Sequence, residues 1–193
     1  MIHEVRNFIE PEICQWVIDW FENTPKDYDN LQDEFFLGRT IAISNVNQYE
    51  VKKRFKIFDQ MMVQTIAKLF PEDEYIFTEN TNVVKWPSGI RASDTSSYAM
   101  DPHRDNEYDH EKDEHLTMRD YTTICYLNDD YEGGHTFFPE YGTECIPETG
   151  KVVFLPSDIL HGVTSIRGGT RYTIATWFTR DLSLIHISEP TRL

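Results

Sequence analysis

The sequence predicts a mainly β fold, a small barrel or two-sheet jelly roll supported by helices near its N-terminus. Before residue 70, two segments carry apolar residues at helical spacing. From Tyr75 onward the chain changes to short β-rich runs separated by Gly, Pro and Asp turns. We therefore expect one domain over residues 1–181, with helical support at about 10–70 and a β core at about 75–181.

The first helix is predicted to follow a short N-terminal strand. Pro11 suits the first helical turn, and the helix should end near Thr24 and Pro25. Its apolar stripe consists of Ile13, Trp16, Val17, Trp20 and Phe21. This spacing is typical of an amphipathic helix that packs one face on a core.

A second helix is predicted over about residues 48–69, because apolar side chains again recur every three or four positions. Pro71 should stop it. Its stripe consists of Val51, Phe55, Phe58, Met62, Ile66 and Leu69. Both helices are expected to cover one face of the β core.

The β core is predicted from five runs rich in β-branched and aromatic residues. These runs span residues 75–86, 121–128, 135–139, 151–155 and 171–179. Each is bounded by turn residues, as antiparallel strands usually are.

Composition excludes some classes of function. The net charge is −15 with 18 Lys and Arg, and no basic cluster offsets it, so nucleic acid is not an expected partner. The three cysteines lack a CxxC arrangement, which argues against a disulfide framework or a zinc ribbon. No apolar run is long enough to span a bilayer and no signal-peptide core begins the chain. We expect a soluble cytoplasmic protein without a membrane partner.

Two segments are set aside from the site. Residues 182–193 follow a natural domain end and are interpreted as a non-native or disordered tail. Residues 106–120 crowd acidic residues with two histidines. We interpret this segment as a solvated loop, with a second metal site or an acidic lid for a cationic substrate as the alternatives.

A metal site is predicted from His103 and Asp105, which lie two positions apart in an expected extended segment. Alternate side chains of a strand point the same way, so both can reach one ion. His161, at the end of an apolar run, is the best third ligand. Two imidazoles and one carboxylate form the facial triad of non-haem Fe(II) oxygenases, which leaves three coordination positions open. A zinc hydrolase with the same ligands is an alternative.

Arg171 is a candidate anion-binding residue. It begins a run that alternates like a half-buried strand, and an inward-pointing arginine must find an anion because a buried unpaired guanidinium is costly. Its planar fork suits a carboxylate, and Thr173 shares its face of the strand. A structural ion pair of Arg171 with Asp158 or another acid is the alternative.

Between Asn82 and Asp181 the chain resembles the Fe(II)/2-oxoglutarate-dependent dioxygenases, in their prolyl 4-hydroxylase-like branch. The matching motifs are residues 83–89, 102–105, 124–128, 132–139, 150–156, 161–163 and 169–172, in that order. The resemblance implies a double-stranded β-helix of the cupin-like jelly-roll type. It implies that His103, Asp105 and His161 hold Fe(II).

For the cosubstrate, the resemblance implies that Arg171 binds the distal carboxylate of 2-oxoglutarate and that Tyr126 hydrogen-bonds to it. Trp177 matches a position in the pocket wall. One residue departs from the family pattern, since many relatives carry Tyr where this chain has Trp86. An indole can only donate a hydrogen bond, so this change bears on substrate identity.

The implied reaction is hydroxylation by O2, coupled to the decarboxylation of 2-oxoglutarate to succinate, with ascorbate as a candidate accessory reductant. The favoured substrate is a peptidyl proline, and a free amino acid or another protein side chain is the alternative; the oligomeric state is left open. A nucleic-acid demethylase would carry a second arginine where Trp177 stands. A non-catalytic cupin-like binding module is a further alternative.

Overall fold

The structure is a computed structural model that describes residues 1–29, 38–72, 75–107 and 114–181. The interpretation of the tail at 182–193 therefore lies outside the described residues, as does the central part of the acidic segment, residues 108–113.

Two helices form where the apolar spacing predicts them. Helix α1 spans Pro11–Asn23 with the proline in its first turn, and α2 spans Tyr49–Leu69. The buried side chains of α2, Val51, Phe55, Met62 and Ile66, all belong to the predicted stripe. On α1 the buried side chains are Cys14, Val17 and Phe21; Cys14 was not predicted, and Ile13 of the predicted stripe is exposed. Short 3-10 helices also occur at Lys26–Tyr28 (η1), Ile43–Asn45 (η2) and Glu114–Met118 (η3).

The strands of the described residues form three antiparallel sheets. The major sheet has the order β1-β9-β5-β12-β3-β2 and the minor sheet the order β4-β10-β7-β8, while β11 pairs with β6. The bounds are β1 His3–Val5, β2 Arg39–Ala42, β3 Phe77–Pro87, β4 Tyr98–His103, β5 Tyr121–Tyr126, β6 Glu132–Gly133, β7 Thr136–Phe138, β8 Thr143–Cys145, β9 Val152–Pro156, β10 His161–Thr164, β11 Ile166–Gly168 and β12 Thr170–Thr179.

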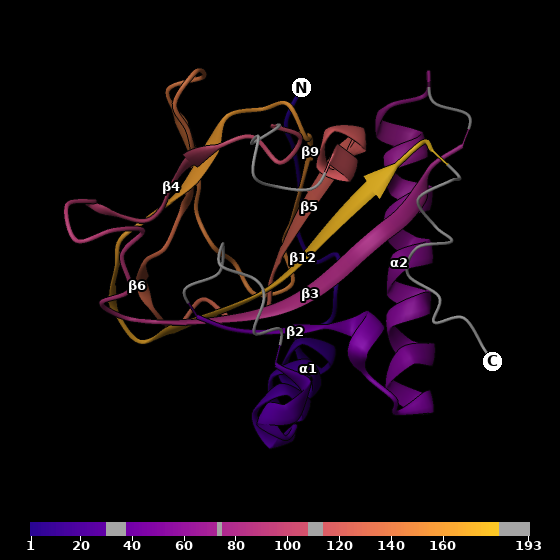
Figure 1. Ribbon diagram of the computed structural model, residues 1–193, viewed down its shortest axis with the longest axis horizontal. Helices are drawn as coiled ribbons and strands as arrows, with labels where there is room; N and C mark the ends of the chain where they lie inside the picture. The colour runs from indigo at the N-terminus through magenta and orange to yellow at the C-terminus, as the bar shows by residue number, and fades with distance from the viewer. Residues whose placement is uncertain (30–37, 73–74, 108–113, 182–193) are drawn as a thin grey trace.

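The elements are arranged in layers, with the helices on one side of the major sheet and the minor sheet on the other (Figure 1). One core lies between helices and sheet and includes Phe21 and Phe55 packed with Ile174 and Phe178 of β12. Two smaller clusters join the major and minor sheets, for example through Leu155. The predicted double-stranded β-helix is confirmed.

Strands β3, β5, β7, β9 and β12 fall within the five predicted runs to within one or two residues. The short strands β2, β6, β8, β10 and β11 were not predicted, because two to four residues do not establish an alternating pattern. Strand β4 contains Pro102, which cannot donate to a ladder; it is tolerated because β4 is an edge strand of the minor sheet.

Candidate metal centre

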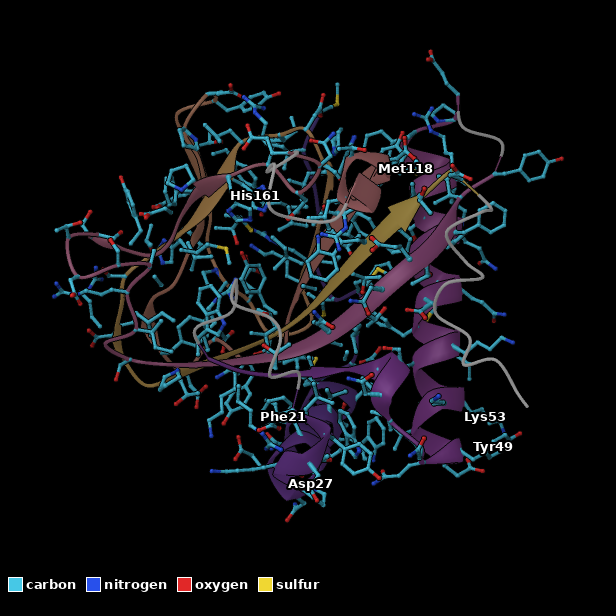
Figure 2. The ribbon with its side chains drawn as sticks, in the orientation of Figure 1. Phe21, Asp27, Tyr49, Lys53, Met118 and His161 are labelled. Carbon is cyan, nitrogen blue, oxygen red and sulfur yellow. The ribbon has the colours of Figure 1, made fainter. Side chains whose placement is uncertain are left out.

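The pairing of β4 with β10 brings two distant histidines together. His103 is the last residue of β4 and His161 is the first of β10, and they are direct partners in the antiparallel register. Their ring centroids are 4.6 Å apart. Figure 2 labels His161 where it lies beside β4. Strand pairing therefore brings the two histidines to opposite positions of one ladder.

Asp105 differs from the expectation of an extended segment. Strand β4 ends at His103, and Asp105 lies in the turn that follows. Its backbone N–H donates to the carbonyl oxygen of Ser157 at 2.9 Å, which fixes the turn against the end of β9. His161 likewise does not end the apolar strand: that strand ends at Pro156, and a turn separates it from β10.

The three predicted residues nevertheless converge on one point. One ligand atom from each of His103, Asp105 and His161 lies within 4.8 Å of the others. Asp105 Oδ1 is 3.5 Å from His103 Nε2, and Asp105 Oδ2 is 3.5 Å from His161 Nε2. The side chains are 16%, 8% and 5% exposed for His103, Asp105 and His161, so the cluster opens toward solvent on the His103 side.

Hydrogen bonds orient both imidazoles for metal binding. Nδ1 of His103 is 3.0 Å from the carbonyl oxygen of Asp101, and Nδ1 of His161 is 2.9 Å from that of Ile159. A carbonyl oxygen only accepts, so each Nδ1 carries the proton. In the neutral rings the Nε2 lone pairs then face a carboxylate. Three acceptors that point at one another fit a bound cation.

The protonation states also suit a cation. Burial opposes the charge of Asp105, but the neighbouring His161 and His103 and the hydrogen bond from Thr122 hold the pKa of Asp105 well below its usual value. Burial lowers the pKa of His161. Burial also opposes a charge on His103, but Asp105 outweighs it and raises the pKa of His103. An ionised carboxylate and a neutral His161 are the forms that bind metals.

Arg171 lies in the interior between the two sheets, at the start of β12. It is 4% exposed, and its Nε donates to the carbonyl oxygen of Gly134 at 3.1 Å. The guanidinium carbon is 5.5 Å from the ring centroid of Trp86 and 5.4 Å from that of Tyr126. Within the described part of the chain no carboxylate pairs with Arg171, so the alternative of a structural ion pair with Asp158 or another acid is not seen there.

The three other predicted cosubstrate residues lie on the same face of the major sheet as Arg171. Thr173 Oγ1 is 3.4 Å from Nη1 of Arg171, and Thr173 is the strand partner of Tyr126. The hydroxyl of Tyr126 donates to Thr136 Oγ1 at 2.6 Å, and burial raises its pKa, so it stays a neutral donor. This group of residues is suited to bind one carboxylate of a small dicarboxylic acid.

Trp177 is 6% exposed and lies opposite Thr122 in the pairing of β12 with β5. The guanidinium of Arg119 covers its ring at 4.4 Å from the centroid, and Arg119 Nε is 2.6 Å from Glu79 Oε2. Thr122 in turn contacts Asp105, with 2.6 Å between Oγ1 and Oδ2. Trp177 therefore lies on the side of the sheet that carries the metal cluster.

Thr122 and Ser157 were missed by sequence reasoning. Neither residue type is a preferred metal ligand, and their contact with the cluster depends on strand positions far from residues 103–105. The only available signal is the alternation of β5, which places Thr122 on the same face as Tyr126.

Comparison with known proteins places these residues in a family context. Residues 90–179 match the 2OG-Fe(II) oxygenase superfamily. The chain is similar to prolyl 3-hydroxylase 2 of Rattus norvegicus, with 36% identity over 72 residues, which is 34% of this chain and 10% of that protein. The chain thus spans about a tenth of the length of the curated relatives it matches.

Solved structures share the fold across nearly the whole chain. The viral collagen prolyl hydroxylase of Paramecium Bursaria Chlorella virus-1, in its 2OG complex, has a TM-score of 0.65 and 16% identity, covering 92% of this chain and 94% of that one. A prolyl hydroxylase of Trichoplax adhaerens, in complex with a hypoxia inducible factor oxygen degradation domain peptide fragment, has a TM-score of 0.67 and 15% identity, covering 98% and 87%.

Proposed function

We propose that this protein hydroxylates a prolyl residue of a peptide. The premise is the match of residues 90–179 to the 2OG-Fe(II) oxygenase superfamily. One observation carries the proposal. The interior between the two sheets holds both a converging His103, Asp105 and His161 cluster and a buried Arg171 that has no carboxylate partner among the described residues. An iron site beside a dicarboxylate site is what a 2-oxoglutarate oxygenase needs.

His103, Asp105 and His161 would hold Fe(II) and would leave coordination positions for the reactants. Bound Fe(II), with 2-oxoglutarate and O2, supplies the oxidation that yields succinate, CO2 and the hydroxylated product. Arg171 pairs with the distal carboxylate of 2-oxoglutarate through its fork, and the Tyr126 hydroxyl would turn from Thr136 Oγ1 to donate to the same group. The dry interior strengthens this ion pair because few waters compete for it.

The choice of a peptidyl proline rests on the relatives. The curated relative and both solved structures named above are prolyl hydroxylases, and the Trichoplax protein is seen with a peptide fragment. The prolyl 4-hydroxylase-like motifs favour C4 as the position of hydroxylation. The 72-residue match to a prolyl 3-hydroxylase makes C3 the second candidate position. A free amino acid is the alternative substrate.

The decisive experiment combines purified protein with Fe(II), 2-oxoglutarate and proline-rich peptides under air. We expect iron-dependent succinate that a peptide stimulates, and a hydroxyproline product whose isomer is assigned by amino-acid analysis. Asp105→Ala should abolish both signals. Succinate stimulated by free proline but by no peptide would contradict the substrate class, and turnover that persists in Asp105→Ala would contradict the metal centre.

A further inference from the structure

Two buried hydroxyl groups form a chain that ends on Asp105. Thr122 Oγ1 donates to Asp105 Oδ2 at 2.6 Å, and Ser157 Oγ is 3.0 Å from Thr122 Oγ1. A threonine hydroxyl has one proton, and Thr122 donates it in the hydrogen bond to the carboxylate of Asp105. The Ser157 hydroxyl must therefore be the donor in its hydrogen bond with Thr122. Thr122 is 2% exposed and Ser157 0%, and water therefore does not compete for either bond.

The hydrogen bonds that run from Ser157 through Thr122 to Asp105 make the two carboxylate oxygens of Asp105 unequal. Each oxygen faces one imidazole at 3.5 Å, Oδ1 that of His103 and Oδ2 that of His161. Only Oδ2 accepts a hydrogen bond from a hydroxyl of the described residues, that of Thr122. The Ser157 carbonyl also holds the Asp105 backbone N–H at 2.9 Å, so both the main chain and the side chain of Asp105 are fixed. A carboxylate held in this way cannot rotate freely to offer a cation both oxygens.

We propose that Thr122 is a positioning residue that makes Asp105 a one-oxygen ligand. The inference rests on the proposed metal centre. By keeping Oδ2 engaged, Thr122 leaves Oδ1 for the metal and keeps free the coordination position that the second oxygen would otherwise fill. Ser157 acts one step further away, because it orients the hydroxyl of Thr122.

The next residue of β5 provides a matched control. Thr123 is 0% exposed, and its Oγ1 has no hydrogen-bond partner among the described residues. It points to the opposite face of the sheet, away from Asp105, because side chains of a strand alternate. Valine has nearly the shape of threonine without the hydroxyl, so Thr122→Val and Thr123→Val remove the same group from adjacent buried positions.

The test measures Co(II) binding and the visible absorption of the Co(II)-loaded protein, which reports coordination number. Thr122→Val should weaken Co(II) binding by about 10–100-fold and change the spectrum, as loss of a partner of a metal ligand usually does. Thr122→Ser, which keeps the hydroxyl, should restore both. Thr123→Val should match the parent. Urea unfolding of the metal-free variants separates these effects from loss of folding.

The outcomes distinguish the two proposals. A parent protein that does not bind Co(II) refutes the metal centre itself. A parent that binds Co(II) while Thr122→Val binds it equally well, with the same spectrum, refutes the positioning role, as does a failure of Thr122→Ser to restore binding. Should Thr122→Val not fold, Ser157→Ala decides: we expect several-fold weaker binding, and an unchanged dissociation constant overturns the proposal.

Discussion

At the scale of single residues, the least replaceable group outside the metal cluster is the guanidinium of Arg171. Its environment is built from rings, a carbonyl oxygen and a hydroxyl, none of which neutralises its charge. Such a buried charge is stable only with an anion nearby, and the proposed cosubstrate supplies one. Arg171 therefore links cosubstrate binding to the stability of the fold.

Replacement of Arg171 should affect 2-oxoglutarate binding and leave the metal site intact. We expect Arg171→Lys, which keeps the charge but loses the fork, to raise the KM for 2-oxoglutarate by about 10-fold or more, from the loss of one charge-assisted hydrogen bond. Co(II) affinity should not change. Arg167→Ala, at an exposed position of β11, is the control and should leave both quantities unaltered. Equal losses of metal and 2-oxoglutarate affinity in Arg171→Lys would argue against separate roles.

Removal of a histidine from the cluster should abolish metal binding. Loss of a residue that hydrogen-bonds to a metal ligand usually weakens metal affinity by about 10–100-fold. We expect His161→Ala to lose more than this, because the substitution removes a ligand atom itself. His135→Ala is the matched control, since His135 pairs with Glu144 at 3.3 Å and lies outside the cluster. Calorimetric titration with Mn(II) or Co(II) checks both variants. Parent-like affinity in His161→Ala would show that the metal lies elsewhere.

The sequence identified the residues of the site better than their surroundings. His103, Asp105 and His161 were predicted from type and order, and the structure brings them together. The backbone conformation at Asp105 was predicted wrongly, because Asp105 lies in a turn and not in an extended strand. Thr122 could not be predicted, because its role depends on a cross-strand contact that no local pattern records.

At the scale of elements, the turn before β9 fixes the N-terminal segment. The carbonyl of Gly150 accepts the backbone N–H groups of Phe8 and Ile9 at 2.9 and 3.2 Å. Gly150 has a φ of +78°, and a Cβ there would overlap the carbonyl oxygen of Ile9. Gly142 has a φ of +61° with nothing within 4 Å of such a Cβ. The two glycines share a backbone conformation but differ in the space around them.

This difference predicts unequal costs of alanine. Gly142→Ala should cost about 1–2 kcal/mol of unfolding free energy from its left-handed backbone alone. Gly150→Ala carries the same penalty and adds about 1–3 kcal/mol from overlap with the N-terminal segment. Urea unfolding of the two variants checks the order. Equal costs would mean that the segment preceding α1 moves aside freely.

Asp59 makes the packing of α2 on the major sheet depend on pH. Burial raises the pKa of Asp59 to about 6, although Thr81 donates a hydrogen bond to it at 3.1 Å. Between pH 4 and 6 the folded state then binds more protons than the unfolded state, so the stability contributed by Asp59 is present below this range and is lost as the pH rises through 6.

Asp59→Asn should remove this loss. We expect the variant to gain on the order of 1–2 kcal/mol relative to the parent at pH 7.5 and little or nothing at pH 4.5. Urea unfolding at both pH values measures the difference, and other titrating groups cancel because they are common to both proteins. A gain of equal size at both pH values would exclude ionisation as its cause.

The elements themselves were predictable in proportion to their length. Both helices and the five longer or more apolar strands carry enough residues for a periodic pattern. Strand β10, which contains only His161 to Thr164, does not, and it becomes a strand because β4 and β7 pair with it on either side. Tertiary contacts thus decide the short strands that form the site.

At the scale of the whole molecule, the layered fold separates support from function. The helices cover one face of the major sheet (Figure 1). The cluster of His103, Asp105 and His161 lies on the other side, at the minor sheet, where Figure 2 labels His161. Among the described residues no helix is long and apolar enough to cross a membrane. The jelly roll was predicted from patterning and family resemblance, whereas the order of strands within its sheets was not.

The net charge of −15 should influence which peptides are captured. A proline-rich peptide flanked by lysines should show a lower KM than one flanked by glutamates, because the overall field attracts cations. The difference should shrink as NaCl rises from about 0.02 M to about 0.5 M, where the Debye length falls well below the size of the protein. Initial rates for the two peptides at both salt concentrations test this. A preference that salt leaves unchanged would point to specific contacts.

The register that places His103 opposite His161 also has a kinetic consequence. The two residues are distant in sequence, so the loop between them must close before their strands pair, and contacts of this kind form slowly. A metal that requires both imidazoles can bind only after the minor sheet has closed. Bound metal should therefore slow the unfolding of the folded protein far more than it speeds refolding. It would stabilise the jelly roll only after its strands have paired.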